Sequence, residues 1–168
     1  MIAAVVLAAG AGSRFGGPKQ RLLLPRVLER VGASSVDEIV VVSGAHPLDA
    51  AGARVVDCPD WERGQGASLR CGLESLAQDV DAAVVCLADG PSLASEAIDR
   101  VVETWRRGAQ DVVAASYGGE RGHPVVLGRA VWPAIPDEGA RSLEALLVPC
   151  DDLGAPGDVD RPEDLDFL

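Results

Sequence analysis

The chain has 168 residues, of which 48% are hydrophobic, and its formal net charge is −11 at pH 7. This length is typical of one domain with a sizeable core, and we expect residues 1–168 to form a single domain. The acidic balance argues against nucleic acid or an anionic membrane as a partner, and no apolar run approaches the ~20 residues that span a bilayer.

Apolar, β-branched runs alternate along the chain with segments of helical periodicity. In chain order we expect a strand at 2–7, a helix at 22–31, strands at 38–42 and 54–56, a helix at 65–77, a strand at 82–87, a helix at 94–107, strands at 111–115 and 123–127, a helix at 142–147, a strand at 148–152 and a helix at 162–168. This alternation predicts an α/β domain with a mostly parallel sheet that is covered on both faces.

Two features bear on the compartment. The apolar N-terminus lacks a basic region and leads into a glycine-rich loop, so it is predicted to be a buried strand and not a signal peptide. The cysteines form neither a CxxC pair nor a metal-binding spacing, and we expect all four to be reduced thiols in a cytoplasmic protein. They are Cys58, Cys71, Cys86 and Cys150.

The loop at residues 8–19 directly follows the first predicted strand and contains the only lysine of the chain, Lys19. Its glycines permit positive φ and let backbone N–H groups approach phosphate oxygens. A compact ammonium can follow a phosphate in a way that the planar arginine fork cannot. The basic residues of 1–36 surround this loop, whereas the rest of the chain is strongly acidic. The alternative is that Lys19 lies on a solvated loop without a role.

Two common phosphate-binding motifs do not fit this loop. A dinucleotide-binding GxGxxG would require glycine at position 15, which is Phe15. A Walker A loop would require Ser or Thr after Lys19, where Gln20 stands. The sequence therefore favours neither a dehydrogenase nor a P-loop NTPase.

Acidic residues follow two later predicted elements. Asp89 lies just after the strand at 82–87, where it could hold Mg²⁺ or simply cap a turn before Pro91. Asp158 and Asp160 alternate along an extended segment, which we take to place them on opposite faces, so only one is expected to join a site with Asp89. Capping of the last helix is the alternative role for this pair.

Two further segments are candidate ligand contacts. Gly66 and Ser68 lie where the chain enters the helix at 65–77, and free N–H groups there suit a ribose, a base edge or an anion. Ser68 could equally be only a helix cap. His123, in a Gly-His-Pro element, is either a donor or acid–base group of the substrate pocket or a turn residue without a catalytic role.

Five segments in order resemble the molybdenum cofactor nucleotidyltransferases, specifically the cytidylyltransferase branch of the MobA-like family. They are LAAGAGSRFGGPK, DCPDWERGQGASLRCGL, LADGPSL, GHPVVLG and DVDRPEDL. The resemblance spans nearly the whole chain and implies a Rossmann-like, GT-A-like nucleotidyltransferase fold of three layers. It also implies a Mg²⁺-dependent reaction in which CMP is transferred from CTP to molybdopterin and pyrophosphate is released.

Residue roles follow from the same resemblance. It implies phosphate neutralisation by Arg14 and Lys19, metal binding by Asp89 and Asp160, and a pterin-side contact by His123. The implied nucleotide contacts are Leu7, Ala8, Ala9, Gly10, Gly12, Gly66 and Ser68. Transfer of this kind depends mainly on positioning and charge neutralisation, so no protein nucleophile is expected.

The Leu-Ala-Ala-Gly start and the five-residue step from Arg14 to Lys19 resemble the cytidylyl branch more than the guanylyl branch. The chain also departs from the family, with a short loop at 44–52 and with Gly90 where Gln or Met is common. Three alternatives therefore remain open: GTP as the donor, another acceptor such as a phospholactate or a sugar phosphate, and a non-catalytic nucleotide- or pterin-binding protein.

Overall fold

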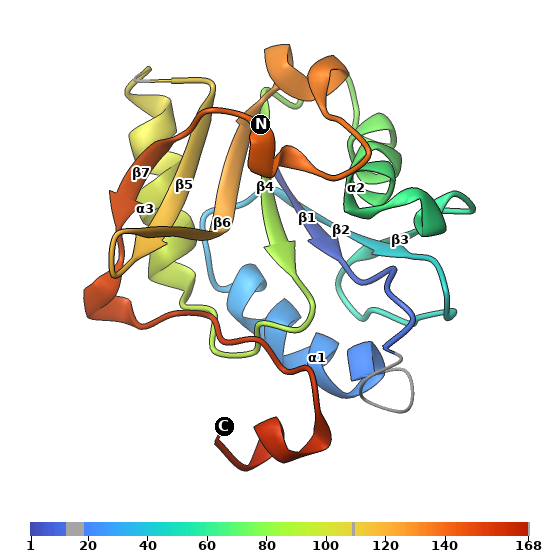
Figure 1. Cartoon of the computed structure of the whole chain (residues 1–168). Helices are drawn as coiled ribbons and strands as arrows, with labels where there is room; N and C mark the ends of the chain where they lie inside the picture. The colour runs from blue at the N-terminus through green and yellow to red at the C-terminus, as the bar shows by residue number, and fades with distance from the viewer. Residues whose placement is uncertain (13–18, 109, 168) are drawn as a thin grey trace.

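The structure, a computed structural model, describes residues 1–12, 19–108 and 110–167, with the backbone alone at 166 and 167. Its described residues form a seven-stranded sheet with the order β3-β2-β1-β4-β6-β5-β7 (Figure 1). The strands are β1 (Ile2–Leu7), β2 (Glu38–Ser43), β3 (Arg54–Asp57), β4 (Ala82–Leu87), β5 (Val112–Tyr117), β6 (Glu120–Gly128) and β7 (Leu146–Pro149). All pairings are parallel except those of β6 with β4 and β5, which confirms the predicted mostly parallel α/β sheet.

Helices cover both faces of the sheet. α1 (Lys19–Gly32) and α3 (Ser95–Arg106) lie on one face, and α2 (Gln65–Glu74) lies on the other with the 3₁₀ segment Arg129–Ala134. β1 shows why two covers are needed, because Ala4 and Val6 join the first core cluster while Ala3 and Val5 join the second. Alternate side chains of a strand point to opposite faces, so a fully apolar strand needs cover on both sides.

The last third of the chain differs from the prediction. The expected helix at 142–147 is wrong, because Ala140–Ser142 is a single 3₁₀ turn and β7 follows at Leu146–Pro149. The expected strand at 148–152 is shifted accordingly, and its end forms the 3₁₀ turn Asp151–Leu153. Pairing of β7 with β5 decides the conformation of this segment, which local apolar spacing alone cannot show. The final element, Pro162–Phe167, is 3₁₀ and not α-helical.

The thiol prediction is wrong for two of the four cysteines. Cys58 and Cys71 form a disulfide, with 5.8 Å between their Cα atoms, whereas Cys86 and Cys150 are free and buried. The disulfide joins Cys58, just after β3, to Cys71 in α2, because the fold places α2 beside the end of β3. Within the described residues, no helix combines the length and the apolar character needed to cross a membrane.

Candidate active site

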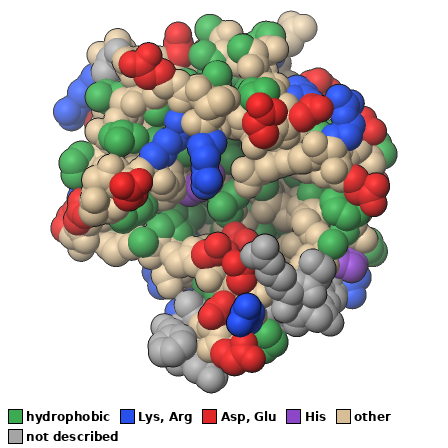
Figure 2. Space-filling model, in the orientation of Figure 1, with side chains coloured by type: hydrophobic (Ala, Val, Ile, Leu, Met, Phe, Trp, Pro, Cys, Tyr) green, Lys and Arg blue, Asp and Glu red, His purple; other side chains and the backbone are tan. Residues whose placement is uncertain are grey.

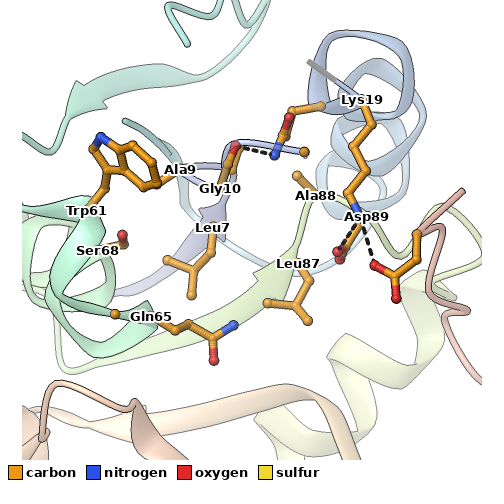
Figure 3. Close-up of a pocket in the computed structure, with 15 residues that line it drawn as sticks. Leu7, Ala9, Gly10, Lys19, Trp61, Gln65, Ser68, Leu87, Ala88 and Asp89 are labelled. Atoms are coloured by element: carbon orange, nitrogen blue, oxygen red, sulfur yellow. Dashed lines mark hydrogen bonds and ion pairs between the residues drawn. The ribbon is translucent and has the colours of Figure 1, made fainter. Parts of the chain in front are cut away.

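The main pocket lies at the carboxyl ends of β1 and β4. These strands pair in parallel with Leu7 opposite Leu87, so the segments that follow them leave the sheet side by side. β1 continues to β2 on one side while β4 lies on its other side, which makes this edge a topological switch point, the usual ligand position in open α/β sheets. The pocket has a volume of about 500 Å³, and Figure 3 shows the residues around it.

Backbone hydrogen bonds hold the segment after β1 in place. Ala8 donates its N–H to the carbonyl of Val42, and Ala9 accepts from the N–H of Ala45, both at 3.0 Å. The Gln20 side-chain amide donates to the Gly10 carbonyl at 2.7 Å. Leu7, Ala8, Ala9, Gly10 and Gly12 therefore all line the pocket, where the sequence placed a phosphate cradle. Arg14, the other predicted cation of this loop, lies outside the described residues.

Lys19 is the first residue of α1, three positions before the predicted helix start, and its side chain is almost fully buried. Its ammonium donates to the Val159 carbonyl at 2.5 Å and lies 3.3 Å from both Asp89 Oδ2 and Asp160 Oδ1. The two carboxylates keep more solvent contact, with 29% and 45% of their side chains exposed. The fold thus brings together one cation and two acids from segments that are 70 and 141 residues apart in sequence.

Asp158 also belongs to this acidic group, which corrects the expectation that only one of Asp158 and Asp160 could join Asp89. Residues two apart in an extended segment share a face, so the premise of that expectation was wrong. Burial raises the pKa of Asp158, and the neighbouring charges of Asp89 and Asp160 raise it further. Val159 between the two acids is buried, and its N–H donates to the Asp89 carbonyl at 3.1 Å, which fixes the C-terminal segment against β4.

The donor set fits a hard divalent cation that substrate phosphates help to hold. Within the described part of the chain, no group of three or more His, Cys, Asp or Glu side chains is arranged to bind a metal without other ligands. Mg²⁺ usually takes one or two carboxylates and completes its octahedron with water and phosphate oxygens. Asp89 and Asp160, which face one buried cation, meet that requirement.

Gly90 explains one departure from the family pattern. A Cβ at this position would lie 3.0 Å from the Cβ of Pro156, so Gln or Met could not fit without movement of the C-terminal segment. The Ser92 N–H donates to the Pro156 carbonyl at 2.9 Å, which ties the same segments together. Gly90 therefore allows the segment that carries Asp158 and Asp160 to pack close to Asp89.

The start of α2 contributes Ser68 but not Gly66 to the pocket lining. Ser68 is buried and lines the pocket. The Gly66 N–H donates to the Asp137 carbonyl at 2.8 Å, and a Cβ on Gly66 would overlap the Pro136 carbonyl oxygen. Gly66 is thus a close-packing position in this fold. Gln65 and Trp61 also line the pocket, although sequence reasoning assigned neither a role.

His123 lies beside the main pocket and not within it. It lines two neighbouring cavities that share Gly122 and Arg141 and that border the main pocket through Leu7, Gln65, Leu87 and Asp89. Burial lowers the pKa of His123 to about 4, an effect that Asp89 opposes and that Arg121 and Arg141 reinforce. The imidazole is therefore neutral at pH 7, available as a hydrogen-bond group and not as a cation.

The lowered pKa of His123 predicts a pH effect on stability. Between about pH 4 and its ordinary value of 6.5, the unfolded chain binds a proton here that the folded chain does not. The free energy of unfolding should therefore rise with pH across this range, and the contribution is lost as pH falls from 6.5 towards 4. His123→Gln is expected to flatten this rise in urea denaturation at stepped pH values. An unchanged slope in the variant would contradict the assignment.

Figure 2 shows a hollow in this face of the molecule with acidic side chains at its rim. The cavity thus combines a glycine-containing segment, a buried lysine, a group of carboxylates and an adjoining second cavity. Such an arrangement suits a polyanionic ligand with a bound cation at the carboxyl end of the sheet, together with a second substrate beside it.

Comparison with known proteins agrees with this description. Residues 4–152 match the model of the MobA-like NTP transferase domain. The 3-phospho-D-glycerate guanylyltransferase of Phenylobacterium zucineum (strain HLK1) is 32% identical over 155 residues, which cover 82% of this chain and 69% of that protein. The nicotine blue oxidoreductase of Paenarthrobacter nicotinovorans is 29% identical over 195 residues, covering 98% and 94%. The manganese complex of Rv0371c from Mycobacterium tuberculosis H37Rv is 25% identical, with a TM-score of 0.78 and coverage of 99% and 97%.

The family match covers most of the chain, so the protein belongs to the MobA-like NTP transferase domain family and is a nucleotidyltransferase of that family. The resemblance to the MobA-like family and the predicted fold class are thereby confirmed. The names of the two similar proteins differ in reaction type, so family membership alone does not define the substrates.

Proposed function

We propose that the protein transfers CMP from CTP to molybdopterin in a Mg²⁺-dependent reaction that releases pyrophosphate. The observation that carries this proposal is the position of buried Lys19 against Asp89 and Asp160 at the switch point of the sheet. Nucleotidyl transfer needs a cation for the phosphates and carboxylates for the metal, and both are present on one pocket wall. The choice of CTP and molybdopterin rests on the resemblance of the five sequence segments.

The proposed roles of the described residues rest on the geometry, and that of Arg14 rests on the family resemblance alone. The segment from Leu7 to Gly12 would border the phosphates, and Lys19 together with Arg14 would neutralise their charge. Asp89 and Asp160 would hold the metal, which when bound supplies charge neutralisation at the phosphates. An acceptor phosphate oxygen attacks the α-phosphorus, and the bond to the bridging oxygen of the leaving pyrophosphate breaks. No covalent intermediate with the protein is needed.

The adjoining cavities at His123 are the proposed position of the acceptor. A neutral imidazole and the guanidinium of Arg141 line them next to the acidic group. Phosphorylated acceptors other than molybdopterin would fit the same charges, and the guanylyltransferase relative is named for such an acceptor. Transfer to such an acceptor, or from GTP, is the nearest alternative, and a non-catalytic nucleotide- or pterin-binding protein is the other.

A nucleotide panel tests the proposal. The purified protein is heated with CTP, GTP, ATP or UTP, each with and without Mg²⁺, and then assayed for pyrophosphate release with molybdopterin and with 3-phosphoglycerate. A ligand at 100 times its dissociation constant adds about 2.7 kcal/mol to stability. We expect the largest shift with CTP and Mg²⁺, and pyrophosphate release with molybdopterin. A preference for GTP would move the assignment to guanylyl transfer, whereas binding without release of pyrophosphate would favour a binding protein.

We also propose that the chain forms a single nucleotidyltransferase domain. A cytoplasmic location is part of the same proposal, since nucleoside triphosphates are made and used in the cytoplasm. The Cys58–Cys71 disulfide is unusual for that compartment. Thiol titration of the denatured protein, purified with alkylation at lysis, separates the cases. The disulfide predicts two reactive thiols, those of Cys86 and Cys150. Four reactive thiols would show that Cys58 and Cys71 are reduced in the cell, as expected of a cytoplasmic protein.

A further inference from the structure

Trp61 lies at the end of the main pocket away from Lys19. Figure 3 shows the indole on one side, the Lys19 and Asp89 pair on the other, and Leu7, Ala9 and Gly10 between them. Aromatic residues make up only 4% of the chain. Among the described residues, Trp61 is the aromatic side chain that lines this pocket. The pocket therefore has a charged end and an aromatic end.

The indole is held against the sheet by close packing. A Cβ on Gly44 would lie 2.7 Å from both Cβ and Cγ of Trp61, so the absence of a side chain at position 44 allows the tryptophan to sit there. The backbone of Trp61 is also fixed: its amide N–H donates to the Cys58 carbonyl at 3.4 Å, and its carbonyl accepts from the Gly64 N–H at 3.3 Å. Trp61 is nevertheless only half-buried, so part of this large apolar ring remains accessible from the pocket.

Two polar side chains lie next to the ring. Ser68 is 4% exposed and lines the pocket, and its hydroxyl has no hydrogen-bond partner among the described residues. The Gln65 amide, which supplies both a donor and an acceptor, also points into the pocket (Figure 3). A flat heterocycle with donors and acceptors on its edge would match an aromatic face flanked by these groups.

We propose that Trp61 is the stacking platform for the nucleobase of the triphosphate substrate, with Gln65 and Ser68 at the base edge. This inference rests on the proposed function, since it places the base at the pocket end opposite the phosphate-binding lysine. Stacking is tolerant of base identity because every base has a π-face, so the base preference comes from the edge contacts and not from the ring.

The test compares a ligand that has a base with one that lacks it. Dissociation constants for CTP and for inorganic tripolyphosphate, both with Mg²⁺, are measured by calorimetry on the unsubstituted protein, Trp61→Phe and Trp61→Leu. Trp61→Leu is expected to weaken the affinity for CTP about ten- to a hundredfold and to leave the affinity for tripolyphosphate unchanged. Trp61→Phe, which keeps an aromatic face, should stay within about threefold of the unsubstituted protein for both ligands.

Intrinsic fluorescence gives a second readout that a merely structural role would not move. CTP should quench the unsubstituted protein and the control Trp105→Phe, whose substitution lies on α3 and not on the pocket. Quenching should be absent in Trp61→Phe even though CTP still binds. An equal loss of CTP and tripolyphosphate affinity in Trp61→Leu, or unchanged CTP affinity, would overturn the assignment. If no nucleotide binds the unsubstituted protein, the proposed function and the role of Trp61 both fail. If CTP binds but the Trp61 variants do not behave as expected, only the role of Trp61 fails.

Discussion

Lys19→Ala is expected to lower the rate of nucleotidyl transfer by a factor of about 10²–10³ or more, to the limit of detection, while the fold survives. The reason is that the loss of one preorganised group that stabilises developing charge typically costs that much. Lys19 is the buried cation of the pocket that the structure describes, and its ammonium already faces the two proposed metal carboxylates. Pyrophosphate release under saturating substrate, together with a thermal melt, measures both halves of the prediction.

Arg26→Ala is the matched control, because it removes one positive charge from an exposed position of the same helix. It should retain the activity of the unsubstituted protein. Lys19→Ala should also bind Mn²⁺ more tightly in the absence of nucleotide, since Asp89 and Asp160 lose the positive charge that lies 3.3 Å from each. Full transfer activity in Lys19→Ala would remove this residue from the proposed site.

Asp89→Asn is expected to abolish metal-dependent transfer and to weaken Mn²⁺ binding to the protein at least tenfold. The substitution keeps the shape of the side chain but removes the charge, and a neutral amide oxygen binds Mg²⁺ or Mn²⁺ more weakly than a carboxylate does. Stability should change little, because Lys19 keeps its contacts with Asp160 and the Val159 carbonyl. The loss of one negative charge also reduces the electrostatic repulsion among the acidic side chains that include Asp158 and Asp160.

Titration with Mn²⁺, followed by electron paramagnetic resonance without substrate, measures the binding directly and does not depend on turnover. Asp49→Asn, an exposed aspartate outside the pocket lining, is the control and should behave as the unsubstituted protein. Unchanged Mn²⁺ affinity and unchanged transfer in Asp89→Asn would exclude Asp89 as a ligand. Loss of transfer with unchanged Mn²⁺ affinity would assign it a role towards the substrate instead.

The elements that locate the pocket could be predicted from local sequence. β1 and β4 have the predicted bounds because both are continuous apolar runs bounded by turn residues. Once two such strands are parallel neighbours, the residues after them must meet at one sheet edge. This rule brings the segment after Leu7 next to Asp89. Lys19 could be singled out for the same reason, as the one lysine at the end of that loop.

Contacts between distant segments decided the rest. The spacing of 13 residues between Cys58 and Cys71 does not reveal that α2 returns beside the end of β3. Residues 142–147 have helical apolar spacing, yet pairing with β5 makes part of them an edge strand. Trp61 lines the pocket because the segment after β3 packs against Gly44, which follows β2. Local sequence patterns do not show that these two segments are in contact.

The acidic group of Asp89, Asp158 and Asp160 shows most clearly which features local sequence predicts and which depend on the fold. That acids follow β4 and precede the final 3₁₀ segment could be predicted from the sequence, because both are local features of the chain. The positions of Asp158 and Asp160 beside Asp89, and the pairing of Lys19 with two of these acids, depend on the folded chain. The physical reason is that contacts between segments far apart in sequence fix the C-terminal segment beside the pocket. The Val159 N–H donates to the Asp89 carbonyl, the Ser92 N–H donates to the Pro156 carbonyl, and the Val159 carbonyl accepts from Lys19.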